Sequence, residues 1–360
     1  MRNIAVAMSG GIDSSVTALL LKEQGHNLKG VTLRLWDYLS EGCEEKETGC
    51  CSMDSILEAR EFCRKLGYEH HIVDIRDEFK ATVVQDFIDE YLAGRTPNPC
   101  VVCNPIIKWD KVLQKADEIG CEYIATGHYA KIEEKNGRWY VTKADDDSKD
   151  QTYVLWKLTQ DQLKRTLFPL GHYRKSEIKQ LADERGFVRL AKKKESQEVC
   201  FIPDNDYRGF LKKRVPSLEQ QVEGGAYINK SGKVLGKHHG YPFYTIGQRK
   251  GLEIALGKPQ YVLDIDPVSN TVMLGDNEDL LTNSMKVGRF NGQKYQHLEV
   301  GMRLMVKIRY NTKPSWCVVK SIENEIINID FEVPVSAVTP GQSAVFYEEN
   351  DVVGGGIILK

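Results

Sequence analysis

The sequence lacks the features that would place it in a membrane or outside the cell. The only uninterrupted apolar run near its start is residues 4–8, too short for the core of a signal peptide, and no later segment could span a bilayer. The cysteine count, nine, is odd, which argues against an extracellular disulfide framework. We therefore expect a cytoplasmic protein with no membrane partner, whose thiols are kept reduced.

The chain also lacks a charge bias, internal repeats and low-complexity tracts. Its 49 lysines and arginines face 51 aspartates and glutamates, which gives a formal net charge of −2, and 41% of its residues are hydrophobic. This composition excludes a disordered chain and a uniformly basic nucleic-acid-binding protein, so any RNA surface must be local. A length of 360 residues predicts two or three domains.

Strand and helix patterns alternate in the first half of the chain. We expect strands at residues 4–8, 28–35, 70–73 and 123–126, and helices after residue 11, at 54–66, at 78–92 and from 105 onward. This alternation is typical of an α/β domain with a doubly wound parallel sheet. After about residue 201, short β runs predict two small β domains, the last a β-barrel. The predicted domains are 1–205, 206–278 and 279–360.

A loop rich in glycine and serine, SGGIDSS, follows the first predicted strand. It lies at a helix N-terminus, where backbone N–H groups and the helix dipole attract anions, and Gly10 and Gly11 let a phosphate approach the backbone. The lysine of a Walker A loop is missing, and so is the dinucleotide fingerprint GxGxxG. Taken alone, the loop is equally compatible with an ordinary turn capped by Ser9 or Asp13.

SGGIDSS resembles the SGGxDS signature of the PP-loop ATP pyrophosphatases, which have an adenine nucleotide alpha hydrolase-like fold and split ATP between its α and β phosphates. The resemblance implies that the loop holds pyrophosphate and Mg²⁺, while two further residues border the adenosine. The implied ATP-binding residues are Ala7, Met8, Ser9, Gly10, Gly11, Ile12, Asp13, Ser14, Leu33 and Gly127. The loop alone is also compatible with a synthetase or amidotransferase acting on a small-molecule acid or amide.

The stretch TPNPCVVCNPIIKWD places Cys103 directly before Asn104 and Pro105. Asn104 is a good N-cap and Pro105 a good first helical residue, so we expect a helix to begin here with Cys103 at its N-terminus. The helix dipole, together with nearby Lys108 and Lys111, would lower the pKa of the thiol and favour the nucleophilic thiolate. A reactive thiol is favoured over a structural one.

The other cysteines differ in their surroundings. Cys200 ends an apparent strand after three consecutive lysines in KKKESQEVCFIPD, and this setting fits a reactive and a structural thiol equally well. We expect three thiols to pack in the core: Cys63, Cys121 and Cys317. Three more occupy a predicted loop without a convincing fourth ligand for zinc: Cys43, Cys50 and Cys51.

Motifs spread along the chain match a known family: AMSGGIDSSV, GCCSMDS, GRTPNPCVVCNPIIKW, ATGHYA, SKDQTYVLW, FPLG, KKKESQEVCFIPD, YTIGQRKGL and GQSAVFY. By these motifs the sequence resembles the tRNA-specific 2-thiouridylases. The resemblance implies an ATP-dependent sulfurtransferase that adenylates and thiolates C2 of the wobble uridine, position 34, in tRNAs for Glu, Gln and Lys. It also implies that Cys103 is a nucleophile, that Cys200 carries a persulfide, and that a sulfur-relay protein or cysteine desulfurase supplies the sulfur.

One position departs from the family pattern, because many members carry Asp where this chain has Cys100. The substitution removes a candidate acid or base beside the nucleophile and creates a CxxC motif. Three thiolates, from Cys100, Cys103 and Cys200, could then hold a [4Fe–4S] cluster with one open iron. The sequence supports cluster and persulfide equally.

A local excess of positive charge occurs between residues 164 and 194, where ten Lys or Arg stand against three Asp or Glu. Such a run suits a tRNA backbone, with Lys192, Lys193 and Lys194 at its end, although in isolation a solvated helix face is the better interpretation. The aromatic run at residues 241–251 is equally an RNA-facing candidate or barrel core. The tRNA-binding residues implied by the resemblance are Asn98, Pro99, Cys100, His128, Lys149, Asp150, Gln151, Arg309, Tyr310 and Gln342. A non-catalytic RNA-binding protein that uses ATP only as a ligand is a further alternative.

Overall fold

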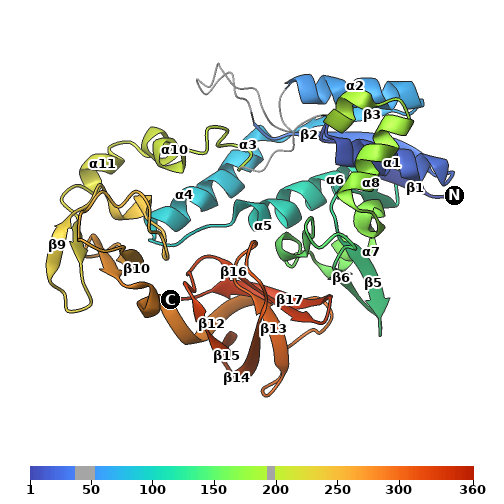
Figure 1. The fold of residues 1–360 in the computed structure, drawn as a ribbon. Coiled ribbons are helices and arrows are strands. Elements are labelled where there is room, and N and C mark those ends of the chain that lie inside the picture. The colour runs from blue at the N-terminus through green and yellow to red at the C-terminus, as the bar shows by residue number, and fades with distance from the viewer. Residues whose placement is uncertain (37–52, 193–198) are drawn as a thin grey trace.

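The computed structural model describes residues 1–36, 53–192 and 199–360. Three units follow one another along the chain in Figure 1: an α/β unit from blue to green, a small β unit in yellow and orange, and a barrel in orange and red. The predicted fold class is thereby confirmed. Within the described residues, no helix has the length and apolar character needed to cross a bilayer.

A five-stranded parallel sheet forms the centre of the N-terminal unit, in the order β3-β2-β1-β4-β7. The strands are β1 (Asn3–Ala7), β2 (Asn27–Arg34), β3 (His70–Asp74), β4 (Tyr123–Ala125) and β7 (Thr166–Leu167). The strand order reverses at β1, since β2 and β3 lie on one side of it and β4 and β7 on the other. In such sheets ligands bind in the crevice at the carboxyl ends of the strands flanking the reversal. The loops after β1 and β4 meet at this crevice.

Helices cover both faces of the sheet because alternate residues of β1 point in opposite directions. Ile4 and Val6 pack with α1 (Ile12–Glu23) and α2 (Met53–Leu66) in one apolar cluster. Ala5 packs instead with α6 (Asp110–Glu118), in a cluster that includes Trp109. The doubly wound arrangement therefore follows directly from the near-continuous apolar character of the first strand.

Two long helical stretches contain π-helical turns, which frequently occur at functional sites. The first joins α3 (Arg76–Phe79), a π-helical turn (Lys80–Val84) and α4 (Gln85–Leu92), and the second joins α5 (Pro99–Cys103), a π-helical turn (Asn104–Trp109) and α6. The predicted helix start at Pro105 is wrong, because the helix already begins at Pro99 with Asn98 as its N-cap. Pro99 satisfies the preference for proline in the first turn, and the π-helical turn accommodates Pro105 inside the helix.

Shorter elements connect this unit to the rest of the chain. They are the hairpin β5 (Lys131–Lys135) and β6 (Arg138–Thr142), the 3₁₀ turns Thr152–Val154 and Pro169–His172, and the helices α7 (Gln160–Lys164), α8 (Lys175–Glu184), α9 (Val188–Lys192), α10 (Tyr207–Arg214) and α11 (Leu218–Gln221). The hairpin joins the edge of the barrel sheet through Thr142 and Asp351. The N-terminal unit and the barrel are therefore bonded through backbone as well as side chains.

The two β units confirm the sequence prediction. The central sheet has the order β10-β11-β8-β9, and the barrel has the order β12-β15-β14-β13-β16-β17, closed by pairing between β12 and β17. The strands are β8 (Ala226–Ile228), β9 (Val234–Lys237), β10 (Tyr261–Asp266), β11 (Thr271–Gly275), β12 (Leu281–Gly292), β13 (Arg303–Lys307), β14 (Ser315–Glu323), β15 (Ile326–Ser336), β16 (Ser343–Glu348) and β17 (Asp351–Ile358). The domain boundaries at residues 205 and 278 stay a prediction.

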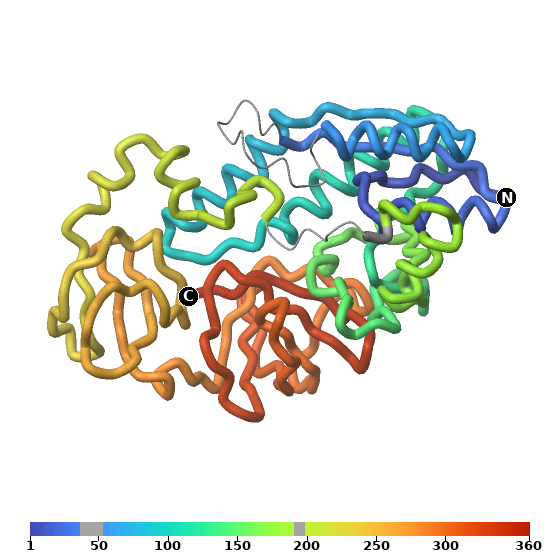
Figure 2. Tube along the Cα trace, turned by 45° about the horizontal axis from the view of Figure 1, so that its top comes forward, coloured from blue at the N-terminus to red at the C-terminus, as the bar shows by residue number. Residues whose placement is uncertain are grey.

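Buried side chains tie the three units together. One apolar cluster runs from Trp36 and Phe79 in the first unit through Phe201 to Tyr227 and Val262 of the central sheet. A second interface joins the first unit to the barrel, where the Trp156 Nε1–H donates to Ser343 Oγ at 3.0 Å. In both Figure 1 and Figure 2, the chain between α4 and α5 runs along the barrel. We call α5, which contains Cys100 and Cys103, the cysteine helix. The residues just before it therefore lie at the junction of all three units.

Candidate active site

The SGGIDSS loop turns directly from β1 into α1 at the carboxyl edge of the sheet. Gly11 is the N-cap of α1 and no side chain caps it, so neither Ser9 nor Asp13 caps this helix as the ordinary-turn alternative predicted. Serines instead brace the loop internally: Ser14 Oγ and Ser15 Oγ donate to Gly11 O at 3.1 and 3.0 Å. The first N–H groups of a helix have no acceptor within it, so this end of α1 is suited to bind an anion.

At two positions around this loop, neighbouring atoms lie so close to the backbone that only glycine fits. Gly10 has a φ of +70°, and a Cβ there would lie 2.3 Å from Ser55 O. A Cβ at Gly127, in the loop after β4, would lie 2.8–2.9 Å from atoms of Asp13 and Ser14. These two of the three predicted ATP-binding glycines therefore lie at the crevice, and the third, Gly11, is the N-cap of α1. Leu33 lies near the end of β2, two residues beyond the partner of the last residue of β1.

A lysine that the sequence analysis did not single out reaches into the loop. Lys175, the first residue of α8, is only 6% exposed, and its Nζ lies 2.7 and 2.8 Å from the two Asp13 carboxylate oxygens. The Tyr129 hydroxyl donates to Asp13 Oδ1 at 2.8 Å. The loop thus has a buried cation nearby, although its sequence contains none. The sequence did contain a signal for this role. Lys175 is the first residue of the helix that follows the last parallel strand, β7, and that helix begins at the same edge of the sheet as α1.

The environment of Cys103 contradicts the predicted pKa. The thiol is 5% exposed, and burial raises its pKa to about 11, although Lys108 opposes this shift. The helix dipole does not help as predicted, because the helix begins at Pro99 and Cys103 is its fifth residue rather than its N-terminus. Lys111 is paired with Glu78 at 3.2 Å. Cys103 is therefore a protonated thiol in this conformation, and its activation requires a change in its surroundings.

This environment predicts an unusual pH dependence of alkylation. We expect the Cys103 thiol to react with iodoacetamide more slowly than the exposed Cys100 thiol at pH 8, because little of Cys103 is thiolate and access is restricted. Its rate should keep rising with pH towards about 11. Peptide mass spectrometry after timed alkylation measures both rates in one sample. A Cys103 rate that levels off below pH 8 would contradict this environment.

Cys200 packs against the apolar cluster that contains Cys103. It lies in a turn closed by the hydrogen bond from Ile202 N to Val199 O at 2.9 Å, and the strand predicted before it falls mostly outside the described residues. Phe201, directly after it, is 2% exposed and touches the rings of Phe79 and Phe87. The two cysteines thus share one apolar environment, and their direct approach stays a prediction.

The described residues do not fit the predicted iron–sulfur cluster. No group of three or more His, Cys, Asp or Glu side chains among them is placed to hold a metal ion. Cys100 is exposed and Cys103 is buried, so these two thiols of one helix have different surroundings. The thiols of Cys63, Cys121 and Cys317 are buried as predicted. Cys43, Cys50 and Cys51 lie outside the described residues.

Tyr310 and His128 lie near the cysteine helix. The Tyr310 side chain is 40% exposed, and its hydroxyl donates to Asp150 O at 3.1 Å. Burial raises the pKa of Tyr310, and the charges of Asp150 and Cys100 add to this shift. Burial also lowers the pKa of His128 to about 3, so its imidazole is neutral at pH 7. An exposed aromatic ring and a neutral imidazole are suited to a nucleobase rather than to phosphate.

Four more of the residues assigned to RNA by resemblance are engaged within the protein. Gln151 Oε1 accepts from Tyr129 N at 2.9 Å, and Asp150 Oδ2 accepts from the Thr152 hydroxyl at 2.6 Å. Arg309 donates from one nitrogen to oxygens of Ile246, Ala337 and Thr339 at 2.6–3.1 Å. Gln342 donates to two carbonyls just before α5. These side chains organise the site, and their contact with RNA remains untested.

Part of the positive charge of the basic segment at residues 164–194 is compensated within the fold, and its role as an RNA surface stays a prediction. Four of its cations pair with carboxylates from other parts of the chain: Arg165 with Asp117, Lys175 with Asp13, Arg185 with Glu23 and Arg189 with Glu58. The side chains of Lys192, Lys193 and Lys194 lie outside the described residues. A sequence count missed this compensation because the partners are distant in the chain.

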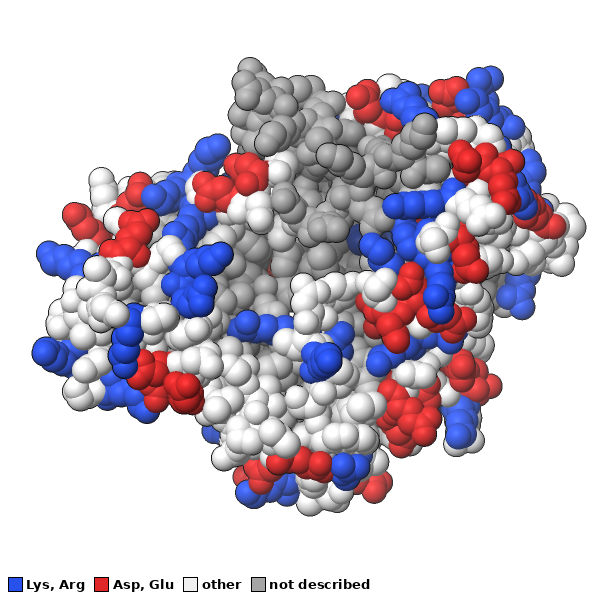
Figure 3. All heavy atoms as spheres, viewed as in Figure 1, with Lys and Arg blue, Asp and Glu red and all other residues white. Residues whose placement is uncertain are grey.

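A groove of about 480 Å³ offers another cationic surface, lined by Arg208, Lys250 and Arg309 among others. Asp206, its acidic residue, is engaged as the N-cap of α10 through Gly209 N at 2.9 Å. In Figure 3, Lys and Arg side chains gather at the centre-left of the face, over the region of α10 and the central sheet. The aromatic residues Phe243 and Tyr244 are 2% exposed, so within the 241–251 run they are core.

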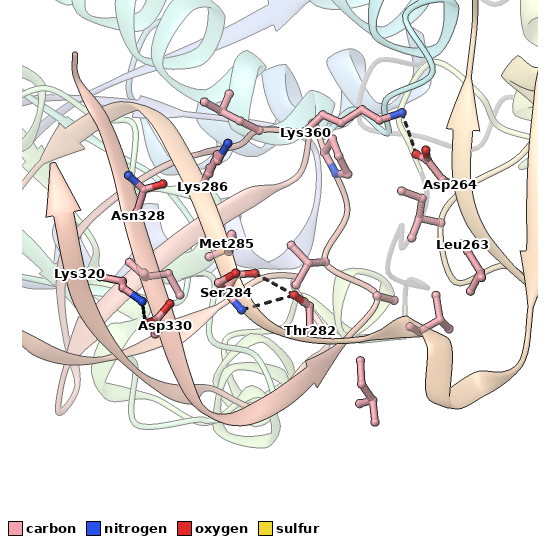
Figure 4. Close-up of a pocket in the computed structure, with 18 of the residues that line it drawn as sticks. Leu263, Asp264, Thr282, Ser284, Met285, Lys286, Lys320, Asn328, Asp330 and Lys360 are labelled. Atoms are coloured by element: carbon pink, nitrogen blue, oxygen red, sulfur yellow. Dashed lines mark hydrogen bonds and ion pairs between the residues drawn. The ribbon is translucent and has the colours of Figure 1, made fainter. Parts of the chain in front are cut away.

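A separate cavity of about 850 Å³ lies between the central sheet and the barrel (Figure 4). Two of its lysines are paired, Lys360 with Asp264 at 2.8 Å and Lys320 with Asp330 at 2.7 Å. None of the described residues that line it belongs to the SGGIDSS loop or to the cysteine helix. The chemistry suggested by the loop and the cysteines therefore does not use this cavity.

Three family models match consecutive parts of the chain: a tRNA methyl transferase HUP domain over residues 2–204, a tRNA methyl transferase PRC-barrel domain over 208–276, and an aminomethyltransferase beta-barrel domain over 283–358. The relatives that match over nearly the whole chain are named for thiolation instead of methyl transfer. The chain is similar to the tRNA-specific 2-thiouridylase of Amoebophilus asiaticus, at 54% identity over 99% of this chain and 94% of the relative. The corresponding protein of Cytophaga hutchinsonii is 51% identical over 99% and 96%.

Solved structures match more distantly. The U34-tRNA thiolase NcsA from Methanococcus maripaludis with its [4Fe-4S] cluster gives a TM-score of 0.34 at 20% identity, over 60% of this chain and 68% of that chain. Similarity at this level establishes nothing about the site.

Proposed function

The chain belongs to the family of tRNA-specific 2-thiouridylases, and from this we propose that it converts the wobble uridine of tRNA, position 34, to 2-thiouridine with ATP. The resemblance read from the sequence motifs is confirmed. The family models are named for methyl transfer, but the full-length relatives are thiouridylases, and two cysteines near one apolar cluster support sulfur chemistry. No observation favours the alternatives of a small-molecule synthetase or a non-catalytic RNA-binding protein.

Uridine requires activation because the C2 oxygen is a poor leaving group. In the proposed first step, this oxygen attacks the α phosphate of ATP, and pyrophosphate leaves into the loop at the N-terminus of α1. The braced serines and Gly10 hold the loop open to the phosphates. Mg²⁺ usually binds substrate phosphates together with one or two carboxylates, and Asp13 fits this role. Mg²⁺ would neutralise phosphate charge as the leaving group departs.

The second step transfers sulfur. The terminal sulfur of a Cys200 persulfide attacks C2, and AMP leaves with the former C2 oxygen. Cys103, once a change in its surroundings has allowed it to lose its proton to water, then attacks Cys200 Sγ as the thiolate, which breaks the persulfide S–S bond, leaves sulfur on C2 and forms a Cys103–Cys200 disulfide. A two-electron thiol reductant restores both thiols, and a sulfur-relay protein or cysteine desulfurase reloads Cys200. We derive no step through an iron–sulfur cluster, because the described thiols do not fit one.

The target base would enter beside Asn98, Pro99 and Cys100, where Tyr310 can stack on it. A wobble base is already single-stranded, so moving it into a pocket costs little. We place the tRNA backbone along the groove of Arg208, Lys250 and Arg309. Lys149 and His128 would also contact the anticodon loop. Selection of tRNAs for Glu, Gln and Lys, and a cytoplasmic location, belong to the same proposal.

Binding of tRNA should depend strongly on salt, since phosphate contacts release counterions. We expect Lys250→Glu to weaken tRNA binding about tenfold and to flatten its salt dependence. The matched control is Lys233→Glu, an exposed lysine in the turn between β8 and β9 that does not line the groove. Filter binding from 50 to 300 mM salt measures both effects. Equal effects of the two substitutions would place the backbone elsewhere, and charge reversal at Lys192, Lys193 and Lys194 then tests the basic run.

An oxygen-free thiolation assay tests the function itself. Native protein is incubated with unmodified tRNA for Glu, ATP, Mg²⁺, a thiol reductant, and a cysteine desulfurase with cysteine as the persulfide donor, and nucleosides are analysed by mass spectrometry. We expect 2-thiouridine at position 34 together with AMP and pyrophosphate in equal amounts. ATP cleavage that depends on a small acid or amide and ignores tRNA would overturn the proposal.

A further inference from the structure

The segment before the cysteine helix has no side-chain cap of its own. Asn98 is the N-cap of α5, but its side chain makes no capping hydrogen bond. The chain also arrives through two prolines, at 97 and 99, which provide no backbone N–H groups to fix it. The position of Cys100 and Cys103 therefore depends on what holds residues 92–98 from outside the helix.

The barrel holds this segment through one amide. Gln342 Nε2 donates to Thr96 O and to Pro97 O, both at 2.9 Å. The Thr96 N–H donates to Pro340 O at 3.0 Å, so each of the two segments donates hydrogen bonds to the other. They lie so close that a Cβ at Gly341 would be 2.9 Å from Thr96 O, and Gly341 has a φ of +90°. These contacts join residues about 245 positions apart.

The central unit holds the same segment at its other end. The Tyr241 hydroxyl donates to Leu92 O at 2.7 Å. Gly94 has a φ of +69°, and a Cβ there would lie 2.8 Å from the Pro267 ring. Both β units therefore form hydrogen bonds to the segment that precedes the cysteine helix, the central unit at Leu92 and the barrel at Thr96 and Pro97.

We infer that Gln342 is a positioning residue for the cysteine helix, and that the barrel acts on sulfur transfer through it. Its Nε2 fixes the two residues before Asn98, while its Oε1, for which the described residues provide no donor, remains open to a tRNA hydroxyl or amino group. One amide then links bound RNA to the placement of both thiols. This inference rests on the proposed function and adds to the resemblance, which implied only an RNA contact for Gln342.

The test separates positioning from RNA binding. Gln342→Met keeps the length of the side chain and removes the donor. The substitution also removes the Oε1 acceptor. We expect kcat for thiolation to fall about tenfold, as the two hydrogen bonds to Thr96 and Pro97 are lost, and KM for tRNA to rise only about threefold, as the acceptor for RNA is lost. A variant whose KM rises while kcat is unchanged would make Gln342 an RNA contact only and overturn the inference. Gln296→Met, at an exposed glutamine of the same barrel, is the matched control and should change neither constant.

Two further measurements keep the inference testable independently of thiolation. Tyr241→Phe removes the other hydrogen bond to the segment and should lower kcat in the same direction, about threefold. Hydrogen exchange at the amides of residues 98, 100 and 101, measured without tRNA, should accelerate in Gln342→Met and not in Gln296→Met. Unchanged exchange in Gln342→Met would overturn the inference even if wild-type protein modified no tRNA, whereas absent thiolation with accelerated exchange would count against the proposed function alone.

Discussion

Serine at position 103 or at position 200 should reduce thiolation by at least about a thousandfold while adenylation of the tRNA persists, because each thiol is required after ATP has been cleaved. Without Cys200 no persulfide forms, so no sulfur reaches C2. Without Cys103 the sulfur bound to C2 stays attached to Cys200. A hydroxyl replaces neither function, since it forms no disulfide.

Single-turnover reactions with protein preloaded with persulfide, radiolabelled ATP and no thiol reductant measure the two steps separately, as pyrophosphate release and as 2-thiouridine. Cys200→Ser should accumulate adenylated tRNA, whereas Cys103→Ser should accumulate protein covalently linked to tRNA through a disulfide that reductant cleaves. Full thiolation by either variant would contradict the proposed roles. A loss of pyrophosphate release in both would instead indicate that the cysteines support folding of the site.

Cys100→Ser is the informative comparison, because Cys100 belongs to the same helix and is exposed. The persulfide mechanism predicts that this variant keeps most of its activity. Loss comparable with that of the other two variants, accompanied by loss of iron after anaerobic reconstitution, would restore the cluster that the described thiols do not fit.

Methionine at position 175 should lower the rate of ATP cleavage by about a hundredfold. Pyrophosphate leaves with several negative charges, and the N-terminus of a helix supplies only about half a positive charge. Lys175 is the buried cation beside the loop, with its Nζ 2.7 Å from Asp13 Oδ1. Since ATP and Mg²⁺ compete for both partners of this ion pair, we expect Lys175 to move to the phosphates and Asp13 to Mg²⁺. Pyrophosphate release with tRNA present measures the loss.

Removal of Lys175 also takes away the cationic partner of the half-buried Asp13 carboxylate, which among the described residues keeps only the hydrogen bond from the Tyr129 hydroxyl, and this by itself destabilises the site. Binding of ATP in the presence of EDTA separates the two effects. Lys175→Met should weaken this binding, whereas Asp13→Asn should strengthen it, because it releases Lys175 and removes a negative charge. Losses of similar size in both variants would show that the pair only supports the fold. Lys179→Met, at an exposed lysine of the same helix, is the control.

Local patterns in the sequence predicted the parts of the molecule that depend on neighbours in the chain. Alternation of strand and helix signals predicted the parallel sheet, and the short β runs predicted the two β units. The glycines and serines of SGGIDSS predicted a loop at a helix N-terminus, since their conformational and hydrogen-bonding roles are local. The burial of Cys63, Cys121 and Cys317 also followed from the pattern around each residue.

The predictions that failed were those that applied a local sequence rule where other parts of the chain determine the result. Asn104 and Pro105 form a good helix start, but Asn98 and Pro99 come first, so Cys103 lies inside the helix and packs in an apolar cluster. Desolvation then outweighs the nearby lysine and raises the thiol pKa. The charge excess of the basic run is also smaller than a residue count suggests, because some of its cations pair with carboxylates elsewhere in the fold.

The sequence by itself determined which chemical groups this protein has: an anion-binding loop, two candidate sulfur carriers and the elements that present them. Only the tertiary structure decided their environments. It brought Lys175 to Asp13 across 162 positions and Gln342 to Thr96 across 246. The physical reason is that charge, pKa and position depend on what surrounds a side chain in space, and at this site most of those surroundings come from remote parts of the chain.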